Sequence, residues 1–337
     1  MAVRVAINGF GRIGRLVLRA IVESGRNDIE VVAINDLGPV ETNAHLLRFD
    51  SVHGRFPHEV KVTGDVIDAG NGQKFKVTAV RNPAELPHKD MGIDIVLECT
   101  GIFTARDKAA AHLEAGAKKV IVSAPSDGAD YTLVMGVNDK GLAREHIVIS
   151  NGSCTTNCLA PVAKVLQDTV GIRHGFMTTV HSYTGDQPTQ DTLHKDLYRA
   201  RAAALSSIPT TTGAAKAIGL VIPELKGKLD GSSIRIPTPN VSLIDLKVSA
   251  ARQTTKEEIN DAFVKAAGDG PLKGILAVTD QPNVSHDFNH DPHSATFHLD
   301  QTKVIDGEFV RVLAWYDNEW GFSNRMADAA VAFAKTL

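Results

Sequence analysis

Apolar and polar positions follow two periods in the first 150 residues of the chain. Short apolar runs typical of buried strands alternate with segments whose apolar residues recur at three and four, as in helices. Strands are predicted at residues 3–7, 30–36, 76–80, 93–99, 118–123, 133–137 and 146–149. A helix is predicted at 104–116, because Thr104 is a capping residue type and Gly116 a stop. This order indicates an α/β fold with a doubly wound parallel sheet.

The pattern changes after residue 150. Residues 234–237 and 241–248 alternate as half-buried antiparallel strands do, and a β-branched run at 176–184 and a run at 309–316 predict further strands. Helical spacing recurs at 159–166, 254–263 and 323–334. We therefore expect a second, α+β domain with a mostly antiparallel sheet.

A glycine loop joins the first strand to the first helix. Gly9, Gly11 and Gly14 have the G-x-G-x-x-G spacing, and Asp36 ends the next strand 22 residues after Gly14. Glycines at this spacing allow a tight turn and a close approach of the backbone to a pyrophosphate at the helix start, while the acid can bind ribose hydroxyls. The sequence predicts a dinucleotide site, and Asp36 favours NAD over NADP because it would repel a 2′-phosphate.

A single cysteine lies where a strand passes into a helix. Cys154 follows the strand at 146–149 and precedes the apolar helix, and its neighbours Ser153, Thr155 and Thr156 are typical of helix starts. Pro161 is expected in the first turn of this helix. The helix dipole and a cationic neighbour would lower the pKa of this thiol, which predicts a reactive thiolate. The alternative is that Cys154 is a small buried hydrophobic residue.

His181 is the candidate partner of this cysteine. The predicted β-branched strand that begins at residue 176 ends at this histidine, and a loop opens at residues 185–188. A histidine beside a thiol could hold it as an ion pair and exchange a proton with it during turnover. Because the chain has 13 histidines, a packed or surface histidine is the competing interpretation.

Several polar residues in the second half of the chain fit more than one role. The long loop at about 182–208 carries Arg199 and Arg201, which would serve either an anion site or a subunit contact. Thr212-Gly213 precedes a helix and is a second candidate anion site. An inward Arg235 would need an anionic partner. Residues 286–293 are rich in histidine and aspartate, but a polar turn fits their irregular spacing better than a metal site, so no metal is expected.

Composition narrows the class of protein. The chain has 337 residues, which suits two domains, and its 43% apolar and 22% charged residues are globular values. A net charge of −3 gives no field that would attract nucleic acid or an anionic membrane. Three cysteines form no disulfide framework, and neither a signal sequence nor a membrane span is evident, so we expect a cytoplasmic protein.

These residues together resemble one known family. The matching runs are NGFGRIGR at 8–15, ND at 35–36, ECTG at 98–101, SCTTNCLAP at 153–161, HSYT at 181–184, RARAA at 199–203, PTTTGAAK at 209–216, RIPTPNVS at 235–242 and WYDNE at 315–319. The chain resembles the phosphorylating glyceraldehyde-3-phosphate dehydrogenases from end to end, and the cysteine run is the most specific of these motifs.

The resemblance implies roles for individual residues. It implies that Cys154 is the nucleophile and that His181 activates it. Phosphate and substrate contacts are implied at Ser153, Thr155, Thr184, Arg199, Thr212, Gly213 and Arg235. Cofactor contacts are implied at Arg12, Ile13, Asp36, Arg81, Ser123 and Asn318, beside the glycines Gly9, Gly11 and Gly14.

The resemblance also implies an organisation and a reaction. It implies an NAD-binding Rossmann domain at 1–152, completed by a C-terminal helix at 319–337, and a catalytic domain at 153–318. The expected protein is a cytoplasmic homotetramer of glycolysis that oxidises glyceraldehyde 3-phosphate with NAD and inorganic phosphate through a hemithioacetal and a thioester. Thr192-Leu193 stands where strictly NAD-using members have Leu-Pro, so minor NADP use is expected.

Two other functions fit the same residues. One is dehydrogenation of another phosphorylated aldehyde, such as erythrose 4-phosphate, on the same scaffold. The other is a regulatory or RNA-binding protein that senses dinucleotides and keeps the site as a relic. The complete set of Cys154, His181 and Arg235 and the acidic net charge argue against the second.

Overall fold

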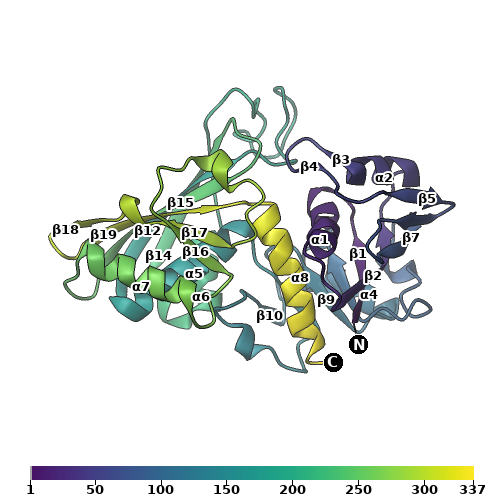
Figure 1. Cartoon of the computed structure of the whole chain (residues 1–337), viewed down its shortest axis with the longest axis horizontal. Helices are drawn as coiled ribbons and strands as arrows, with labels where there is room; N and C mark the ends of the chain where they lie inside the picture. Colours follow the sequence, from purple (N-terminus) through teal and green to yellow (C-terminus); the bar gives the residue numbers. More distant parts are fainter. Residues whose placement is uncertain (1) are drawn as a thin grey trace. The chain divides into compact units, whose positions relative to one another are not determined.

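The computed structural model describes residues 2–337, which form two compact units (Figure 1). The first unit comprises residues 2–133, 139–152 and 323–337, and the second comprises 134–138 and 153–322. The chain therefore leaves the first unit before the candidate cysteine and returns to it at its C-terminal end. Among the described residues, no helix has the length and apolar character needed to cross a membrane.

The first unit is built on a nine-stranded sheet in the order β10-β11-β9-β8-β1-β2-β7-β6-β5. Its strands are β1 Val3–Asn8, β2 Ile29–Asn35, β5 Lys61–Thr63, β6 Val66–Asp68, β7 Lys74–Thr78, β8 Ile95–Glu98, β9 Lys119–Val122, β10 Tyr131–Thr132 and β11 Val148–Ser150. All pairs from β10 to β7 are parallel, and only β5 and β6 add an antiparallel edge. The predicted parallel sheet is confirmed. A small hairpin, β3 Phe49–Asp50 with β4 Gly54–Arg55, lies apart from it.

The helices of the first unit, and the segment that follows β10, differ from the prediction at two places. They are α1 Arg12–Glu23, α2 Val40–Arg48, α3 Arg106–Ala109 and α4 Ala111–Glu114, with short 3-10 turns η1 Pro83–Glu85 and η2 Asp139–Gly141. The single helix predicted at 104–116 is two one-turn helices, and Ala105 rather than Thr104 precedes the first. The strand predicted at 133–137 is a turn, because the Asn138 side chain accepts a hydrogen bond from the Val134 N–H and Gly136 has a φ of +78°.

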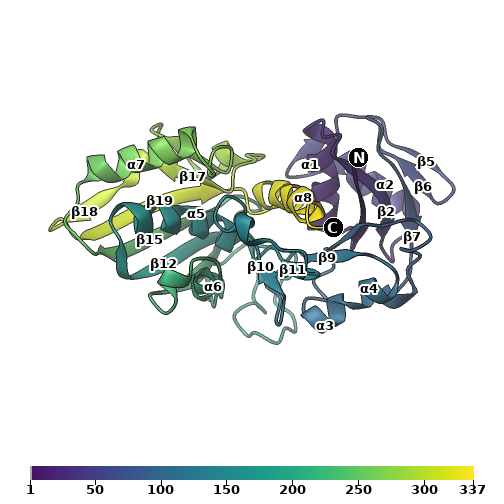
Figure 2. The same ribbon diagram turned by 90° about the horizontal axis from the view of Figure 1, so that it is seen from below.

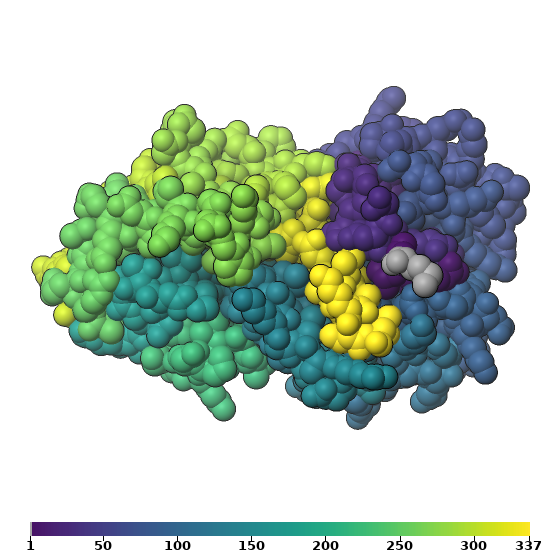
Figure 3. Space-filling view, turned by 60° about the horizontal axis from the view of Figure 1, so that its bottom comes forward, coloured from purple at the N-terminus to yellow at the C-terminus, as the bar shows by residue number. Residues whose placement is uncertain are grey.

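The C-terminal helix, α8 Trp320–Ala334, completes the first unit from residue 323 on. Asp328 pairs with Arg26 at 2.5 Å, and the Lys119 ammonium lies 4.2 Å from the centre of the Phe333 ring. Figure 3 shows this yellow helix at the surface beside the purple start of the chain. Residues at the two ends of the sequence therefore share one core.

The second unit is built on an eight-stranded sheet in the order β13-β14-β12-β15-β19-β17-β16, with β18 paired to β19. Its strands are β12 Ile172–Ser182, β13 Ile208–Thr210, β14 Leu229–Ile236, β15 Ser242–Ala250, β16 Leu276–Thr279, β17 Ala295–His298, β18 Lys303–Ile305 and β19 Phe309–Tyr316. The sheet is mostly antiparallel, as predicted. However, β14 is antiparallel only to β13 and runs parallel to β12, so the prediction for residues 234–237 was half wrong.

Three helices cover one face of this sheet (Figure 2). They are α5 Cys154–Thr169, α6 Ala214–Val221 and α7 Lys256–Gly268, and the 3-10 turns η3 Pro223–Leu225, η4 Ser285–Phe288 and η5 Leu299–Gln301 lie in the connections. Pro161 lies inside α5 rather than in its first turn. A proline there removes one backbone hydrogen bond, so burial of residues such as Leu159 and Val162 in the core must compensate for it.

Replacing Phe333 by Ala tests whether α8 is integral to the first unit. Phe333 is fully buried and carries the Lys119 contact, so the change should lower the free energy of unfolding by about 3–5 kcal/mol. Urea unfolding followed by circular dichroism measures this. The exposed Leu337 serves as a control, because Leu337→Ala should change the value by less than about 0.5 kcal/mol. Equal effects of the two substitutions would contradict the assignment.

Candidate active site

Cys154 is the first residue of α5. Ser153 caps this helix, since its Oγ accepts a hydrogen bond from the Thr156 N–H at 3.0 Å, and Gly152 turns the chain into it with a φ of +64°. The thiol is half-buried, and its Sγ lies 3.6 Å from Nε2 of His181. The structure thus brings together two residues that are 27 positions apart.

His181 is held in one orientation near the end of β12. Its side chain is almost fully buried, and Nδ1 lies 2.7 Å from the carbonyl oxygen of Ser182. A carbonyl only accepts, so this 2.7 Å contact assigns the proton to Nδ1 and leaves the lone pair of Nε2 facing Cys154. Arg235 Nη1 lies 3.2 Å from the same Nδ1 and, in this tautomer, donates to the Ser182 carbonyl and the Thr184 hydroxyl instead. The ring of Tyr316 stands edge-on to the imidazole, with centroids 5.9 Å apart. The imidazole is therefore oriented to receive a proton from the thiol.

Arg235 lies beside His181 because β14 runs parallel to β12, with these two residues in register. Its Nη1 donates to the Ser182 carbonyl at 3.1 Å and to Oγ1 of Thr184 at 3.0 Å. These oxygens are neutral, and among residues 2–337 no carboxylate forms an ion pair with Arg235, so the expected anionic partner is not supplied by the described chain. The guanidinium consequently adds positive charge next to the thiol and the imidazole.

Burial acts against the charges that the predicted thiolate and its ion pair with His181 would carry. Burial raises the pKa of the Cys154 thiol, although Arg235 and the N–H groups at the helix start lower it. Burial, together with Arg235, lowers the pKa of His181 to about 3. The loss of hydration on burial acts against a charge on either partner and opposes the effect of the helix start. Both shifts thus oppose an isolated charge on either partner of the 3.6 Å contact.

Asp186 links Arg199 to the same group of residues. Arg199 Nη1 donates to Asp186 Oδ2 at 2.5 Å, and the other Asp186 oxygen accepts from the Thr184 hydroxyl. Thr184 in turn accepts from Arg235. The structure therefore gathers Arg199, Thr184 and Arg235 into one hydrogen-bonded chain, in which a carboxylate lies between the two guanidinium groups.

Tyr316 is a supporting residue that the sequence did not single out. Its hydroxyl lies 2.8 Å from Oγ1 of Thr155 and 2.9 Å from Oγ1 of Thr179. Thr155 is buried, so its hydroxyl faces this tyrosine rather than solvent. Tyr316 and Thr155 are 161 positions apart, and no sequence pattern links a strand tyrosine to a helix-start threonine.

Thr212 and Gly213 lie at the start of α6. Gly213 is the residue before the helix, and Thr212 Oγ1 accepts from the Ala214 N–H at 3.2 Å. The preceding strand β13 pairs with β14, which places Ile208 opposite Arg235. The loop that contains Thr212 thus begins next to the strand that carries Arg235.

The first unit contains a cavity of about 400 Å³ at the glycine loop. It is lined by Asn8, Gly9, Gly11, Asn35, Asp36, Leu37, Val80, Arg81, Cys99, Thr100, Ile102 and Phe103. Gly9 has a φ of +88°, and a Cβ at this position would lie 2.7 Å from the Thr100 nitrogen. A Cβ at Gly14 would lie 2.0 Å from the Gly9 carbonyl oxygen. Larger residues are therefore excluded from both positions.

The start of α1 fits an anionic group. Gly11 precedes this helix and has no side chain to cap it, and the N–H groups of a helix start attract anions. Arg12 and Ile13 open the helix, and Arg12 pairs with Asp50 at 2.7 Å. Asp36 is held at the next strand end by the N–H groups of Phe10 and Gly38, each at 2.9 Å. The cavity thus combines the donors and the acid that a dinucleotide requires.

The two remaining predicted cofactor residues lie at other strand ends. Ser123 follows β9, and its N–H donates to the Glu98 carbonyl at 3.0 Å. Asn318 belongs to the second unit, where its Oδ1 lies 2.9 Å from Ser182 Oγ and 2.8 Å from Ser242 Oγ. Ser182 therefore connects the orientation of His181 to that of Asn318.

A buried polar network contacts residues that line the cavity, and no sequence pattern had indicated it. Glu98 is 1% exposed, and its Oε2 accepts from Asn8 Nδ2 at 2.5 Å and from His112 Nε2 at 3.0 Å. His88 Nε2 reaches His112 Nδ1 at 3.1 Å. Burial, and then the neighbouring His112, lowers the pKa of His88 to about 4. No local spacing signals this network, because its members come from different strands and helices.

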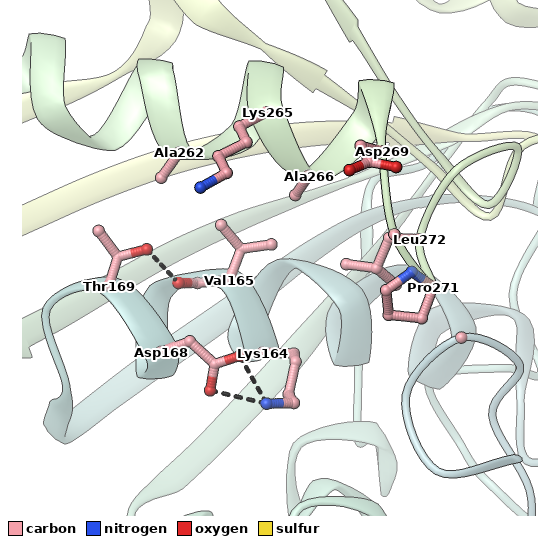
Figure 4. Close-up of a pocket in the computed structure, with 12 residues that line it drawn as sticks. Lys164, Val165, Asp168, Thr169, Ala262, Lys265, Ala266, Asp269, Pro271 and Leu272 are labelled. Atoms are coloured by element: carbon pink, nitrogen blue, oxygen red, sulfur yellow. Dashed lines mark hydrogen bonds and ion pairs between the residues drawn. The ribbon is translucent and has the colours of Figure 1, made fainter. Parts of the chain in front are cut away.

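Two other regions add no site residues. Among residues 2–337, no group of three or more His, Cys, Asp or Glu side chains is arranged to hold a metal ion, and this includes the stretch at 286–293. A cavity of about 540 Å³ lies between α5 and α7, where Lys164 pairs with Asp168 and Val165 and Leu272 supply apolar surface (Figure 4). None of the predicted site residues lines it.

The fold and the site define a class of protein. A parallel sheet with a glycine loop and an acid at the following strand end, joined to a unit that presents a thiol to an imidazole, is the arrangement of a dinucleotide-dependent dehydrogenase with a cysteine nucleophile.

Comparison with known proteins specifies the family. Residues 3–106 match the glyceraldehyde 3-phosphate dehydrogenase NAD-binding domain and residues 153–318 match the C-terminal domain of the same family. The chain is 76% identical over 335 residues to glyceraldehyde-3-phosphate dehydrogenase of Xanthobacter flavus, with 99% of each chain covered. It is 71% identical over 337 residues to that of Cereibacter sphaeroides, with 100% of each covered, and 58% identical over 335 residues to that of Geobacillus stearothermophilus, with 99% of each covered.

The chain belongs to the glyceraldehyde-3-phosphate dehydrogenase family. It is an NAD-dependent oxidoreductase, and NAD is its cofactor. The resemblance described from the sequence motifs is therefore confirmed.

Because folding lowers the pKa of the buried His88, we expect the free energy of unfolding to depend on pH. Its pKa is lowered on folding from the ordinary 6.5 to about 4, so the unfolded chain binds an extra proton between these values and stability falls as pH drops from about 6.5 to 4. His88→Gln keeps a donor for His112 but cannot be protonated. Between pH 6.5 and 4, this variant should lose less unfolding free energy than the unaltered protein, by up to about 3 kcal/mol.

Urea unfolding at several pH values measures this difference. His181 also has a lowered pKa, but it is present in both proteins and cancels from the comparison. Identical pH dependence of the two proteins would show that His88 is not buried in the neutral form.

Proposed function

We propose that this protein oxidises glyceraldehyde 3-phosphate to 1,3-bisphosphoglycerate with NAD and inorganic phosphate. The observation that carries the proposal is the 3.6 Å contact between the Cys154 thiol and the free nitrogen of His181, beside the guanidinium of Arg235. The three relatives compared above match the chain from end to end and are named glyceraldehyde-3-phosphate dehydrogenase, so erythrose 4-phosphate is not favoured as the substrate.

The first step follows from the raised pKa of the Cys154 thiol and the lowered pKa of His181. As Sγ of Cys154 attacks the aldehyde carbon, its proton passes to Nε2 of His181 and then to the substrate oxygen, which forms a hemithioacetal. Transfer during attack avoids an isolated charge on either buried group. The Cys154 N–H at the start of α5 would stabilise the developing oxyanion.

The second and third steps use the same imidazole. Bound NAD supplies the acceptor for the hydride that leaves the hemithioacetal carbon. His181 takes the hydroxyl proton, and the carbon becomes a thioester of Cys154. Phosphate oxygen then attacks this carbon, the carbon–sulfur bond breaks, and the sulfur recovers the proton from His181.

Two groups of side chains are proposed to hold phosphate. Arg235, Thr184 and Arg199 form one hydrogen-bonded chain and would bind the phosphate of the substrate, with Asp186 keeping Arg199 in place. Ser153, Thr155, Thr212 and Gly213 lie at two helix starts and would bind the attacking phosphate. In this role, Thr155 would exchange its bond with Tyr316 for one with phosphate.

The cofactor is proposed to bind in the cavity of the first unit. Gly9, Gly11 and Gly14 would allow the pyrophosphate to approach, and Arg12, Ile13, Asp36, Arg81, Ser123 and Asn318 would make the remaining contacts. The carboxylate of Asp36 would face a 2′-phosphate, so NADP should be at most a minor cofactor. In this proposal, residues 1–152 with 319–337 form the NAD-binding domain and 153–318 the catalytic domain.

We also propose that the protein is a cytoplasmic homotetramer of glycolysis. Leu193 is 100% exposed, and Leu197 and Leu205 are each 82% exposed, all within the loop between β12 and β13. Apolar residues gathered in one loop are typical of a surface that another subunit covers. A catalytic thiol must remain reduced, which suits a reducing compartment.

Turnover should require both phosphate and Cys154. The protein mixed with NAD and glyceraldehyde 3-phosphate should produce NADH absorbance that rises when inorganic phosphate is added. Cys154→Ser should lower kcat by about 10³-fold or more and leave NAD binding unchanged, because the first unit is intact. Cys158→Ser, which changes the buried thiol one helical turn later, is the matched control and should retain turnover. Substantial turnover of Cys154→Ser, or a higher kcat/KM for erythrose 4-phosphate, would contradict the proposal.

His181 should control the reactivity of the thiol. Replacing it by Asn removes the proton acceptor, so alkylation of Cys154 by iodoacetamide at about pH 7 should slow by about tenfold or more, and the rate should rise only towards the pKa of an isolated buried thiol. The rate is measured as a function of pH. His174 is exposed on the same strand, and His174→Asn should leave the profile unchanged. An unchanged profile for His181→Asn would remove the proton transfer from the mechanism.

A further inference from the structure

We infer that the buried carboxylate of Glu98 is a positioning residue for NAD, because it orients the side chains that form the floor of the cofactor cavity. The inference rests on the proposed location of NAD in this cavity. Glu98 is the last residue of β8 and does not itself line the cavity, although its neighbours Cys99 and Thr100 do.

Donors from three segments converge on Glu98. Its Oε1 accepts from the Thr100 N–H at 2.8 Å and from the Thr100 hydroxyl. Its Oε2 accepts from Asn8 Nδ2 and His112 Nε2. An ionised carboxylate only accepts, so each of these contacts has a defined direction. Four donors around one buried carboxylate also compensate for its lost hydration.

The direction of the hydrogen bonds extends through two asparagines to a backbone group. Asn8 gives Nδ2 to Glu98, so its Oδ1 faces Asn35 Nδ2, which donates at 2.7 Å. Asn35 Oδ1 then accepts from the Val80 N–H at 2.9 Å. The Glu98 carboxylate and the Val80 N–H therefore determine the orientation of both amides. If either amide rotated by half a turn, two donors or two acceptors would face each other.

The histidine side of the network has a defined direction as well. His112 donates from Nε2 to Glu98, so its Nδ1 is an acceptor and His88 Nε2 donates to it at 3.1 Å. Both histidines are buried. The donors thus form two chains, through Asn35 and Asn8 and through His88 and His112, that both end at the Glu98 carboxylate.

The network matters for binding because its ends are cavity residues. Asn8, Asn35, Val80 and Thr100 all line the cavity and come from the ends of strands β1 and β2 and from the segments after β7 and β8. The Asn35 carbonyl also accepts from the Gly9 N–H at 2.8 Å, which ties the glycine loop to the same network. The orientation of the donors around Glu98 therefore sets the floor on which the dinucleotide would lie.

Glu98→Gln is the direct test. It keeps the size of the side chain but places an NH₂ group where Oε2 faces Asn8 Nδ2. If the Asn8 amide rotates by half a turn to accept from this NH₂ group, its own Nδ2 faces Nδ2 of Asn35. If Asn35 rotates as well, its Nδ2 faces the Val80 N–H, which is part of the backbone and cannot rotate. Titration calorimetry should show that NAD binds about tenfold more weakly. In turnover, KM for NAD should rise while kcat changes little, and alkylation of Cys154 should be unchanged.

A second variant separates orientation from general damage. In the double variant Asn8→Asp with Glu98→Gln, the carboxylate moves by one position along the network. The introduced glutamine can donate to the introduced aspartate and to His112 Nε2 once His112 and His88 have both taken their other tautomers, so that His112 Nδ1 donates to His88 Nε2. The glutamine oxygen still accepts from Thr100. The introduced aspartate also accepts from Asn35. Every bond has a partner again, so NAD affinity should return to within about threefold of the unaltered protein.

Each outcome decides the inference. Unchanged NAD affinity of Glu98→Gln, with or without a lower melting temperature, would show a purely structural role and overturn it. A folded double variant that binds as weakly as Glu98→Gln would also overturn it. If Glu98→Gln does not fold, the double variant alone decides, and recovered binding supports the inference. Failure of the unaltered protein to bind NAD in this cavity, seen as intact binding in Gly9→Val, would instead refute the proposed location of NAD.

Discussion

The contact between the Cys154 thiol and the Nε2 atom of His181 is the interaction on which the candidate active site depends. It requires a helix that begins at the cysteine, a strand that ends near the histidine, and a backbone carbonyl that holds the opposite ring nitrogen. The parallel pairing of β12 with β14 then brings Arg235 into register with His181. A shift of one residue in this pairing would point the guanidinium to the other face of the sheet.

Burial explains how this contact supports chemistry. A charge on either Cys154 or His181 alone loses its hydration, which is why their pKa values move away from neutrality in opposite directions. Proton transfer between the two creates opposite charges at short distance, where they attract each other. The site is thereby suited to exchange a proton during reaction, and Arg235 offsets negative charge that develops nearby.

The first unit shows the same principle in another form. Glu98 is almost completely buried, and it is accommodated because donors from several segments surround it. Fully satisfied polar groups in a core restrict the structure to one arrangement more strongly than apolar packing does. Here the restricted groups include the floor of the cofactor cavity, so the buried charge connects the folding of the sheet to the shape of the binding surface.

The sequence by itself determined the two kinds of sheet, the glycine loop with Asp36, and the helix start at Cys154, because each depends on local periodicity or on residue types at fixed spacing. The local rules failed at two segments. Pro161 lies inside α5 because the core around it compensates for a lost hydrogen bond, and residues 133–137 form a turn through Asn138. Only the tertiary structure paired β14 with β12, set Tyr316 against Thr155, and gathered Glu98, His112 and His88, since these contacts join residues far apart in the chain and leave no pattern along it.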